Sequence, residues 1–70
     1  MRMYITFGQN HVHHCKNVVL DKDCVVTYEC ETEEAGRQRA FELFGRQWAF
    51  CHTRLQDVQL AFYPRGLFEM

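Results

Sequence analysis

The clearest hydrophobic pattern in the chain runs along residues 33–44 and predicts one amphipathic helix. Apolar residues such as Ala40 and Phe44 recur there at intervals of three or four, while polar residues occupy the opposite side. Thr32 can cap the first turn with its hydroxyl, and Gly45 can end the last turn. The pattern therefore predicts a helix that buries one face and exposes the other.

Two charged residues interrupt the apolar side of this predicted helix. Glu33 and Arg37 both project into it, four residues apart and in the order that favours an ion pair. One interpretation is that they lie where the helix extends past its sheet, with the Arg37 stem on neighbouring aromatic rings. The alternative is that they form a charged contact site for a partner.

The segments before and after the helix alternate apolar and polar residues, as half-buried strands do. We expect strands over residues 2–7, 18–20, 24–30, 47–54 and 58–63. The order of strands, helix and strands favours an α+β fold in a single domain that spans residues 1–70. We expect a small, mainly antiparallel sheet of three to five strands, with the helix packed on one face.

The second face of such a sheet needs its own explanation, because one helix can cover only one side. The residues expected on this second face are Tyr4, Thr6, Val25 and Thr27. Within 47–54 both sides carry apolar groups, so the pattern leaves open whether Trp48 and Phe50 lie under the helix or on the other face. If they lie on the other face, it is a contact surface for another protein.

Length and charge limit the classes of function. The chain has 70 residues and a net charge of −1, with 47% hydrophobic residues, which is enough for a small core. A nucleic-acid-binding protein usually carries a positive surface, so this charge argues against nucleic acid as the partner. The aromatic and basic neighbours Trp48 with Arg46, and Tyr63 with Arg65, are accordingly read as core packing rather than as a base-stacking surface.

The sequence shows neither a secretion signal nor a membrane span. Its first ten residues lack an apolar core, and no apolar run approaches the length of a spanning helix. We therefore expect a cytoplasmic protein that does not enter a membrane. In that compartment its four cysteines are expected to be free thiols.

The segment from His11 to Cys15 is the one stretch that resembles a metal-ligand cluster. Imidazole and thiolate are the ligands that zinc prefers, and His11 and His13 would project to the same side of an extended backbone. His14 and Cys15 complete the candidate set. The chain has no second paired motif, which favours a polar loop, or a strand with two solvent-facing histidines. A zinc-binding module organised by this segment remains the alternative reading.

No group of residues indicates catalysis. The chain contains no serine, so a serine nucleophile is excluded. Cys51 and His52 are adjacent, and adjacent residues on a strand point to opposite faces, so they cannot form a catalytic dyad. We expect a protein that is not an enzyme and that needs no cofactor.

Several stretches resemble a group of short, uncharacterised proteins of tailed bacteriophages. They are Tyr4-Ile5-Thr6-Phe7-Gly8-Gln9 with His11 and His13, the AFELFG that ends the helix, the WAF after it, and Tyr63-Pro64-Arg65-Gly66. The resemblance covers nearly the whole chain and supplies no catalytic or binding residues. It implies a phage-encoded protein in the bacterial cytoplasm, where chains of this size commonly inhibit host machinery stoichiometrically, including restriction and CRISPR defences.

Together these observations predict a non-enzymatic interaction protein that binds a host or phage protein. The candidate partner-binding residues are Tyr4, Thr6, Glu33, Arg37, Trp48 and Arg65. Self-association into a homodimer through the second face of the sheet is a further alternative.

Overall fold

The computed structural model describes residues 1–15 and 17–70, and the side chains of all of these except Cys15. Six strands, one α-helix and two short 3-10 helices follow one another along these described residues. In order they are β1 (Arg2–Thr6), β2 (His13–Cys15), β3 (Val18–Leu20), β4 (Cys24–Glu29), α1 (Glu33–Phe44), β5 (Phe50–His52), η1 (Leu55–Asp57), η2 (Leu60–Phe62) and β6 (Gly66–Glu69).

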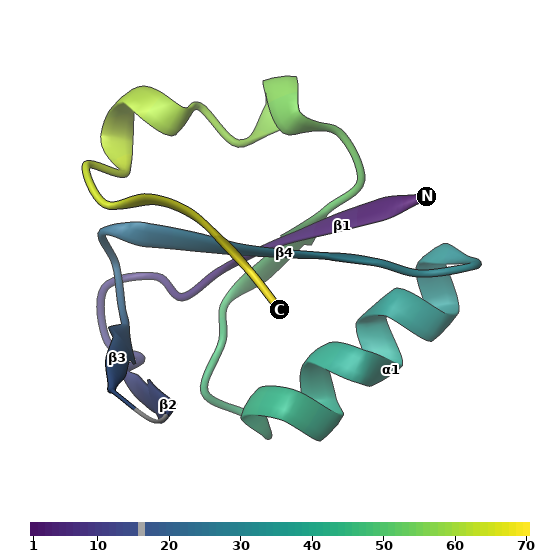
Figure 1. Ribbon diagram of the computed structural model, residues 1–70, viewed down its shortest axis with the longest axis horizontal. Coiled ribbons are helices and arrows are strands. Elements are labelled where there is room, and N and C mark those ends of the chain that lie inside the picture. Colours follow the sequence, from purple (N-terminus) through teal and green to yellow (C-terminus); the bar gives the residue numbers. More distant parts are fainter. Residues whose placement is uncertain (16) are drawn as a thin grey trace.

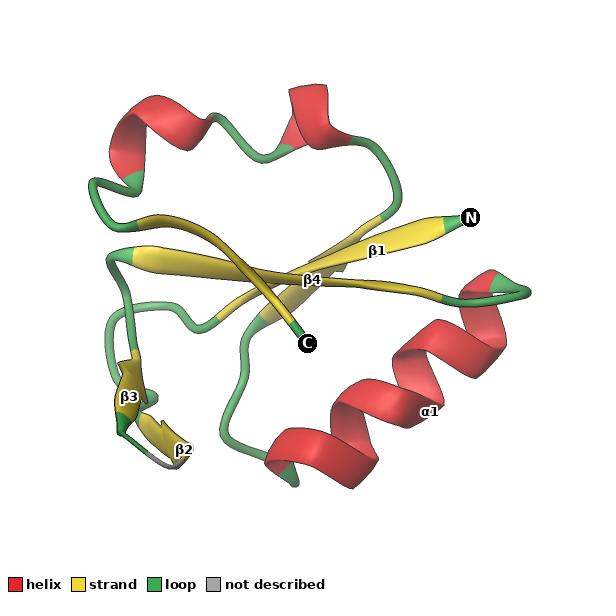
Figure 2. Ribbon diagram, in the orientation of Figure 1, coloured by secondary structure: helices red, strands yellow, loops and turns green. Residues whose placement is uncertain are grey.

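The main sheet has four strands in the order β5-β1-β4-β6. β1 is antiparallel to both of its neighbours, whereas β6 runs parallel to β4. β2 and β3 form a separate antiparallel pair. Figures 1 and 2 show α1 on one side of the main sheet, so the predicted α+β fold is confirmed.

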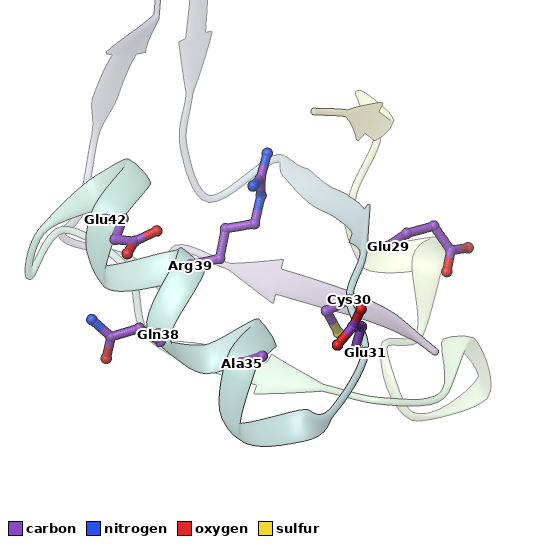
Figure 3. Close-up of a pocket in the computed structure, with 7 residues that line it drawn as sticks. All are labelled: Glu29, Cys30, Glu31, Ala35, Gln38, Arg39 and Glu42. Carbon is purple, nitrogen blue, oxygen red and sulfur yellow. The ribbon is translucent and has the colours of Figure 1, made fainter.

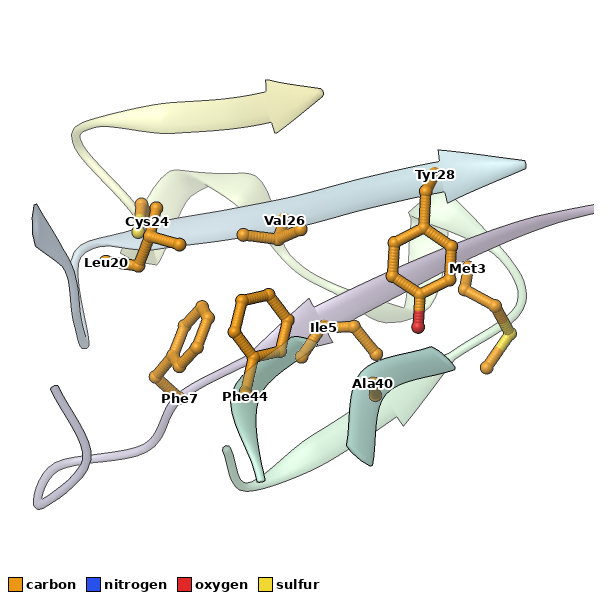
Figure 4. Packing of buried hydrophobic residues seen from close by; sticks show 9 residues of the cluster. All are labelled: Met3, Ile5, Phe7, Leu20, Cys24, Val26, Tyr28, Ala40 and Phe44. Atoms are coloured by element: carbon orange, nitrogen blue, oxygen red, sulfur yellow. The ribbon is translucent and has the colours of Figure 1, made fainter. Parts of the chain in front are cut away.

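The alternation of β1 and β4 places the core between the sheet and α1. Met3, Ile5 and Phe7 are fully buried, as the pattern predicts for one side of the first strand. Figure 4 shows them facing Ala40 and Phe44 of the helix. The rings of Phe7 and Phe44 meet edge to face at 5.1 Å between centroids, a favourable aromatic geometry.

The predicted helix is present with the expected ends. Thr32 caps it by accepting a hydrogen bond from the amide of Ala35 at 3.0 Å. Gly45 follows Phe44 with a positive φ of 63° and donates its amide to the Phe41 carbonyl. Phe41 itself is exposed, although the pattern places it on the apolar side; its ring packs edge-on against Trp48 instead.

The strand predicted over residues 58–63 is wrong. This stretch forms η2 and the end of the turn that contains η1, and its amides bond locally: Val58 to the Leu55 carbonyl and Phe62 to the Gln59 carbonyl. Alternation over six residues cannot separate a strand from two short turns, because both leave apolar residues two apart. β6, which the sequence did not predict, instead occupies the edge of the sheet next to β4.

The strand expected over residues 47–54 is much shorter than predicted. β5 covers only three of the eight residues in 47–54. Trp48 stays outside it because its indole nitrogen donates to the Gly45 carbonyl at 3.1 Å, which keeps the ring at the end of α1. Within β5, Cys51 pairs with Ile5 and packs on the core, so Phe50 lies on the sheet face away from α1.

The second face of the sheet is not open, contrary to expectation. Thr6, Val25 and Thr27 are all buried. Figure 1 shows the reason: the chain from β5 to β6, with η1 and η2, lies on the side of the strands opposite α1. Val58, between the two 3-10 helices, is buried as well. The middle of the sheet is therefore covered on both sides.

Candidate interaction surfaces

One row of cross-strand neighbours shows how the outer face of the sheet is divided. The pairing places Phe50, Thr6, Val25 and Leu67 side by side from β5 to β6. The two central residues are buried, whereas Phe50 at one edge is 66% exposed and Leu67 at the other is 43% exposed. Apolar surface on this face is therefore accessible at its two edges.

The segment that covers this face, residues 55–62, presents further apolar side chains to solvent; we call it the covering segment. Val58 is its buried residue, while Leu55 and Leu60 are exposed and Phe62 is 72% exposed. A benzyl group this exposed gains nothing from the hydrophobic effect in the isolated chain. Binding another protein on this segment would bury these side chains and remove their apolar surface from water.

The backbone of the covering segment is strained at one residue. Gln59 has a φ of 57° and a ψ of 66°, in the left-handed region. This conformation costs a residue with a Cβ roughly 1 kcal/mol, and residues held in it are more frequent at functional sites than elsewhere. The left-handed conformation of Gln59 turns the chain between η1 and η2, three residues before Phe62.

Arg65, three residues after the covering segment, binds β3 and the chain between β3 and β4. Its guanidinium donates to the Val19 carbonyl and lies 3.3 Å from the Asp21 carboxylate, and its backbone amide donates to the Asp23 carbonyl at 2.9 Å. The guanidinium also lies over the ring of Phe68 at 5.2 Å. Arg65, expected as a partner-binding residue, thus holds β6 to the corner that precedes β4.

The other residues expected to bind a partner do not gather in one place. Tyr4 is half-buried on the outer face, while Thr6 beside it is buried and offers a partner no accessible surface. Trp48 lies on the other side of the sheet, half-buried against Phe41 of α1. Sequence spacing cannot show this separation, because it depends on which side each segment of the chain takes.

Glu33 and Arg37 form the ion pair that their spacing predicts. Their charged groups are 3.6 Å apart, and both side chains are more than half exposed. A pair this exposed contributes little to stability, about 0.3 to 0.5 kcal/mol. Gly36, next to Arg37, is buried against Met3 of β1, so this turn of α1 lies against the sheet and the ion pair is exposed to solvent.

A shallow hollow of about 360 Å³ lies between α1 and the end of β4 (Figure 3). Its lining residues are Glu29, Cys30, Glu31, Ala35, Gln38, Arg39 and Glu42. Arg39 reaches from the helix across the ring of Tyr28, at 5.5 Å from the ring centre. Glu29 is engaged by Arg2, whose guanidinium lies 3.2 Å from it and also contacts Glu69 at 2.8 Å.

The histidine segment forms β2 and the loop before it. His13 is half-buried, and its ring packs edge-on against Phe44 at 5.0 Å, which gives it a packing role. His11 is half-buried and His14 is exposed. Within the described residues, no three histidine, cysteine or acidic side chains come together in a way that could hold a metal ion. The side chain of Cys15 lies outside the described residues.

Neither the buried Cys24 nor the Cys51–His52 neighbours provide a nucleophile paired with a base. Cys24 is fully buried, and burial raises the pKa of its thiol, which disfavours the nucleophilic thiolate. Cys51 faces the core and pairs with Ile5, while His52 pairs with Tyr4 on the opposite face. This arrangement agrees with the expectation that Cys51 and His52 cannot act as a dyad.

Of the two accessible aromatics, Phe50 was named by sequence reasoning, with Trp48, as a residue that could lie on either face, whereas Phe62 was not singled out. Both lie in stretches where apolar residues alternate, and alternation alone does not say which residues the fold leaves uncovered.

No helix among the described residues is long and apolar enough to cross a membrane. Comparisons with protein-family models, with curated proteins and with solved structures find no match to this chain.

Proposed function

We propose that this chain is a phage-encoded, non-enzymatic protein that acts by stoichiometric binding to a host or phage protein. The observation that carries the proposal is the covering segment, with Phe62 exposed in the bend that Gln59 makes. The segment leaves three large apolar side chains, Leu55, Leu60 and Phe62, exposed within eight residues, and burying them against another protein would remove apolar surface from water. The phage origin and the bacterial cytoplasm as its location rest on the sequence resemblance.

Two features support binding rather than catalysis. The buried thiol of Cys24 has a raised pKa, and Cys51 and His52 point to opposite faces of the sheet. The net charge of −1 favours a protein partner over nucleic acid. In this account, the rigid sheet and α1 hold the covering segment in place, and the covering segment provides the contacts.

The proposal is tested by capturing tagged protein from bacterial cells and comparing two variants. Phe62→Asp places a charge at the proposed contact, where a buried anchor typically contributes about 2 kcal/mol or more, so partner recovery should fall at least about tenfold. Val12→Asp is the matched control, because Val12 is 45% exposed and precedes β2, outside the covering segment. The control should recover the same partner as the unaltered protein.

If Phe62→Asp captures as much partner as the unaltered protein, the covering segment is not the binding surface. Recovery of no protein above background in any form would overturn the proposal as a whole. Circular dichroism of both variants checks that folding is retained, which we expect because both side chains are exposed.

The finer proposal is that the partner belongs to a host defence system, such as a restriction or CRISPR complex. It rests on the resemblance to phage proteins and on the size of the chain. The identity of the captured partner decides it directly: a defence protein supports this role, and a protein of another kind rejects it.

A further inference from the structure

The two edges of the main sheet differ in how they are protected. Within the described residues, β5 and β6 are the outermost strands, so each has one side without a neighbouring strand. An unpaired strand edge presents backbone N–H and C=O groups that can bind another strand, and proteins commonly block it with charged residues or proline.

The β6 edge carries such protection and the β5 edge does not. Pro64 and Arg65 precede β6, and Glu69 ends it with a charge held by Arg2. Residues 49–53, which contain β5, have the sequence AFCHT, with no proline and no fixed charge. Phe50 stands beside this edge with 66% of its surface exposed. The β5 edge is therefore open to strand pairing in both its backbone and its side chains.

We propose that β5 is a self-association edge, at which two copies of this chain pair their β5 strands antiparallel about a twofold axis at Cys51. Antiparallel pairing of a strand with itself is complementary in its backbone, because each copy offers the other the same pattern of donors and acceptors. The axis joins two four-stranded sheets into one continuous sheet.

The side chains of β5 suit this twofold pairing. Phe50 of one copy lies opposite His52 of the second copy, and Cys51 lies opposite Cys51. No fixed like charges face each other, since residues 49–53 contain no lysine, arginine, aspartate or glutamate. The pairing also covers part of the exposed Phe50 ring, which removes apolar surface from water.

The dimer should be readily reversible. A three-residue strand and one aromatic side chain provide less contact than the roughly 800 Å² per partner of a standard stable interface. We therefore expect a dissociation constant on the order of 10 to 100 μM, which leaves the monomer present at low concentration.

Sedimentation of the unaltered protein from about 5 to 500 μM should show the mass rising from the 8.4 kDa of one chain toward twice that value. Phe50→Lys adds a charge at the edge and should keep the protein monomeric throughout. Leu67→Lys is the matched control, because Leu67 is exposed in the same cross-strand row but at the β6 edge. The control should associate like the unaltered protein.

A monomeric mass for the unaltered protein at the highest concentration would overturn the inference. So would a dimer that survives Phe50→Lys, or one that Leu67→Lys disrupts, since either result places the contact elsewhere.

A second measurement does not depend on the folding of Phe50→Lys. The variant Cys15→Ser with Cys30→Ser leaves Cys51 and the buried Cys24 as its thiols. Oxidation with copper phenanthroline should form a disulfide between the Cys51 residues of two copies, because paired strands bring facing side chains within about 5.5 Å. The comparison protein keeps Cys30 and carries Cys51→Ser. Its two copies should be linked at least about tenfold more slowly. Equal rates would contradict the pairing.

Discussion

At the scale of single residues, Tyr28 shows how the core accepts a polar group. Its ring is almost fully buried between β4 and α1 (Figure 4), and its hydroxyl donates to the Gly36 carbonyl. A buried hydroxyl without a partner would cost about 1 to 3 kcal/mol, so this hydrogen bond permits tyrosine at a core position. Burial raises the pKa of Tyr28 to about 12, and the nearby thiols of Cys30 and Cys51 add to the increase.

The raised pKa of Tyr28 predicts a loss of stability in alkali. Below pH 10 both folded and unfolded chains hold the proton; between pH 10 and 12 the unfolded chain releases it first, so the free energy of unfolding falls as pH rises. A pKa increase of about 2 corresponds to a fall of at most about 2.7 kcal/mol, of which about 2 kcal/mol occurs between pH 9 and pH 11.5. Urea unfolding at pH 9 and pH 11.5 measures it.

The control for this prediction is Tyr28→Phe. It loses the hydrogen bond, which costs about 1 kcal/mol at neutral pH, but it also loses the titrating group. Its stability should therefore fall less than that of the unaltered protein over the same pH interval. Parallel curves for the two proteins would show that Tyr28 does not titrate as described.

At the scale of elements, the position of α1 on the sheet depends on one close approach. A Cβ added at Gly36 would lie 2.3 Å from Met3 Cγ and 2.8 Å from Cys30 Sγ, closer than atoms can pack. Glycine at this helical position therefore brings α1 against β1 and the end of β4. Glycine is otherwise unfavourable within a helix, by about 1 kcal/mol relative to alanine.

Gly36→Ala separates these two effects. The higher helix propensity of alanine would stabilise an isolated helix, whereas the clash with the buried Met3 should lower the free energy of unfolding by about 1 to 3 kcal/mol net. Chemical denaturation measures the difference. The loss should be smaller in a Met3→Ala background, where the Met3 atoms that make the closest clash are absent and only the one with Cys30 Sγ remains. A gain in stability from Gly36→Ala alone would contradict the packing described.

The elements also show what sequence reasoning could reach. The helix over residues 33–44 and the first strands were predictable, because each has a cap or an alternation long enough to identify it. Residues 58–63 were misread, and β6 was missed, because a few residues of alternation do not distinguish a strand from 3-10 turns. A parallel strand such as β6 also depends on the long connection that precedes it, which no local pattern reveals.

At the scale of the whole molecule, the candidate surfaces result from the way the chain covers its own sheet. α1 covers one face, and the chain after β5 covers the middle of the other, leaving Phe50 and Phe62 accessible. The expectation of an open second face failed because it counted only the helix as a cover. Which side chains stay exposed on this side depends on the tertiary path of the chain, and sequence spacing does not give it.

The central claim is that the protein works by stoichiometric binding through the covering segment. Native mass spectrometry of the complex captured with the unaltered protein tests it most directly. The account predicts a discrete complex that contains this chain and its partner in a fixed integer ratio, with both masses unchanged, and that does not form with Phe62→Asp. A partner that returns with an altered covalent mass, or a complex that forms equally well with Phe62→Asp, would contradict it.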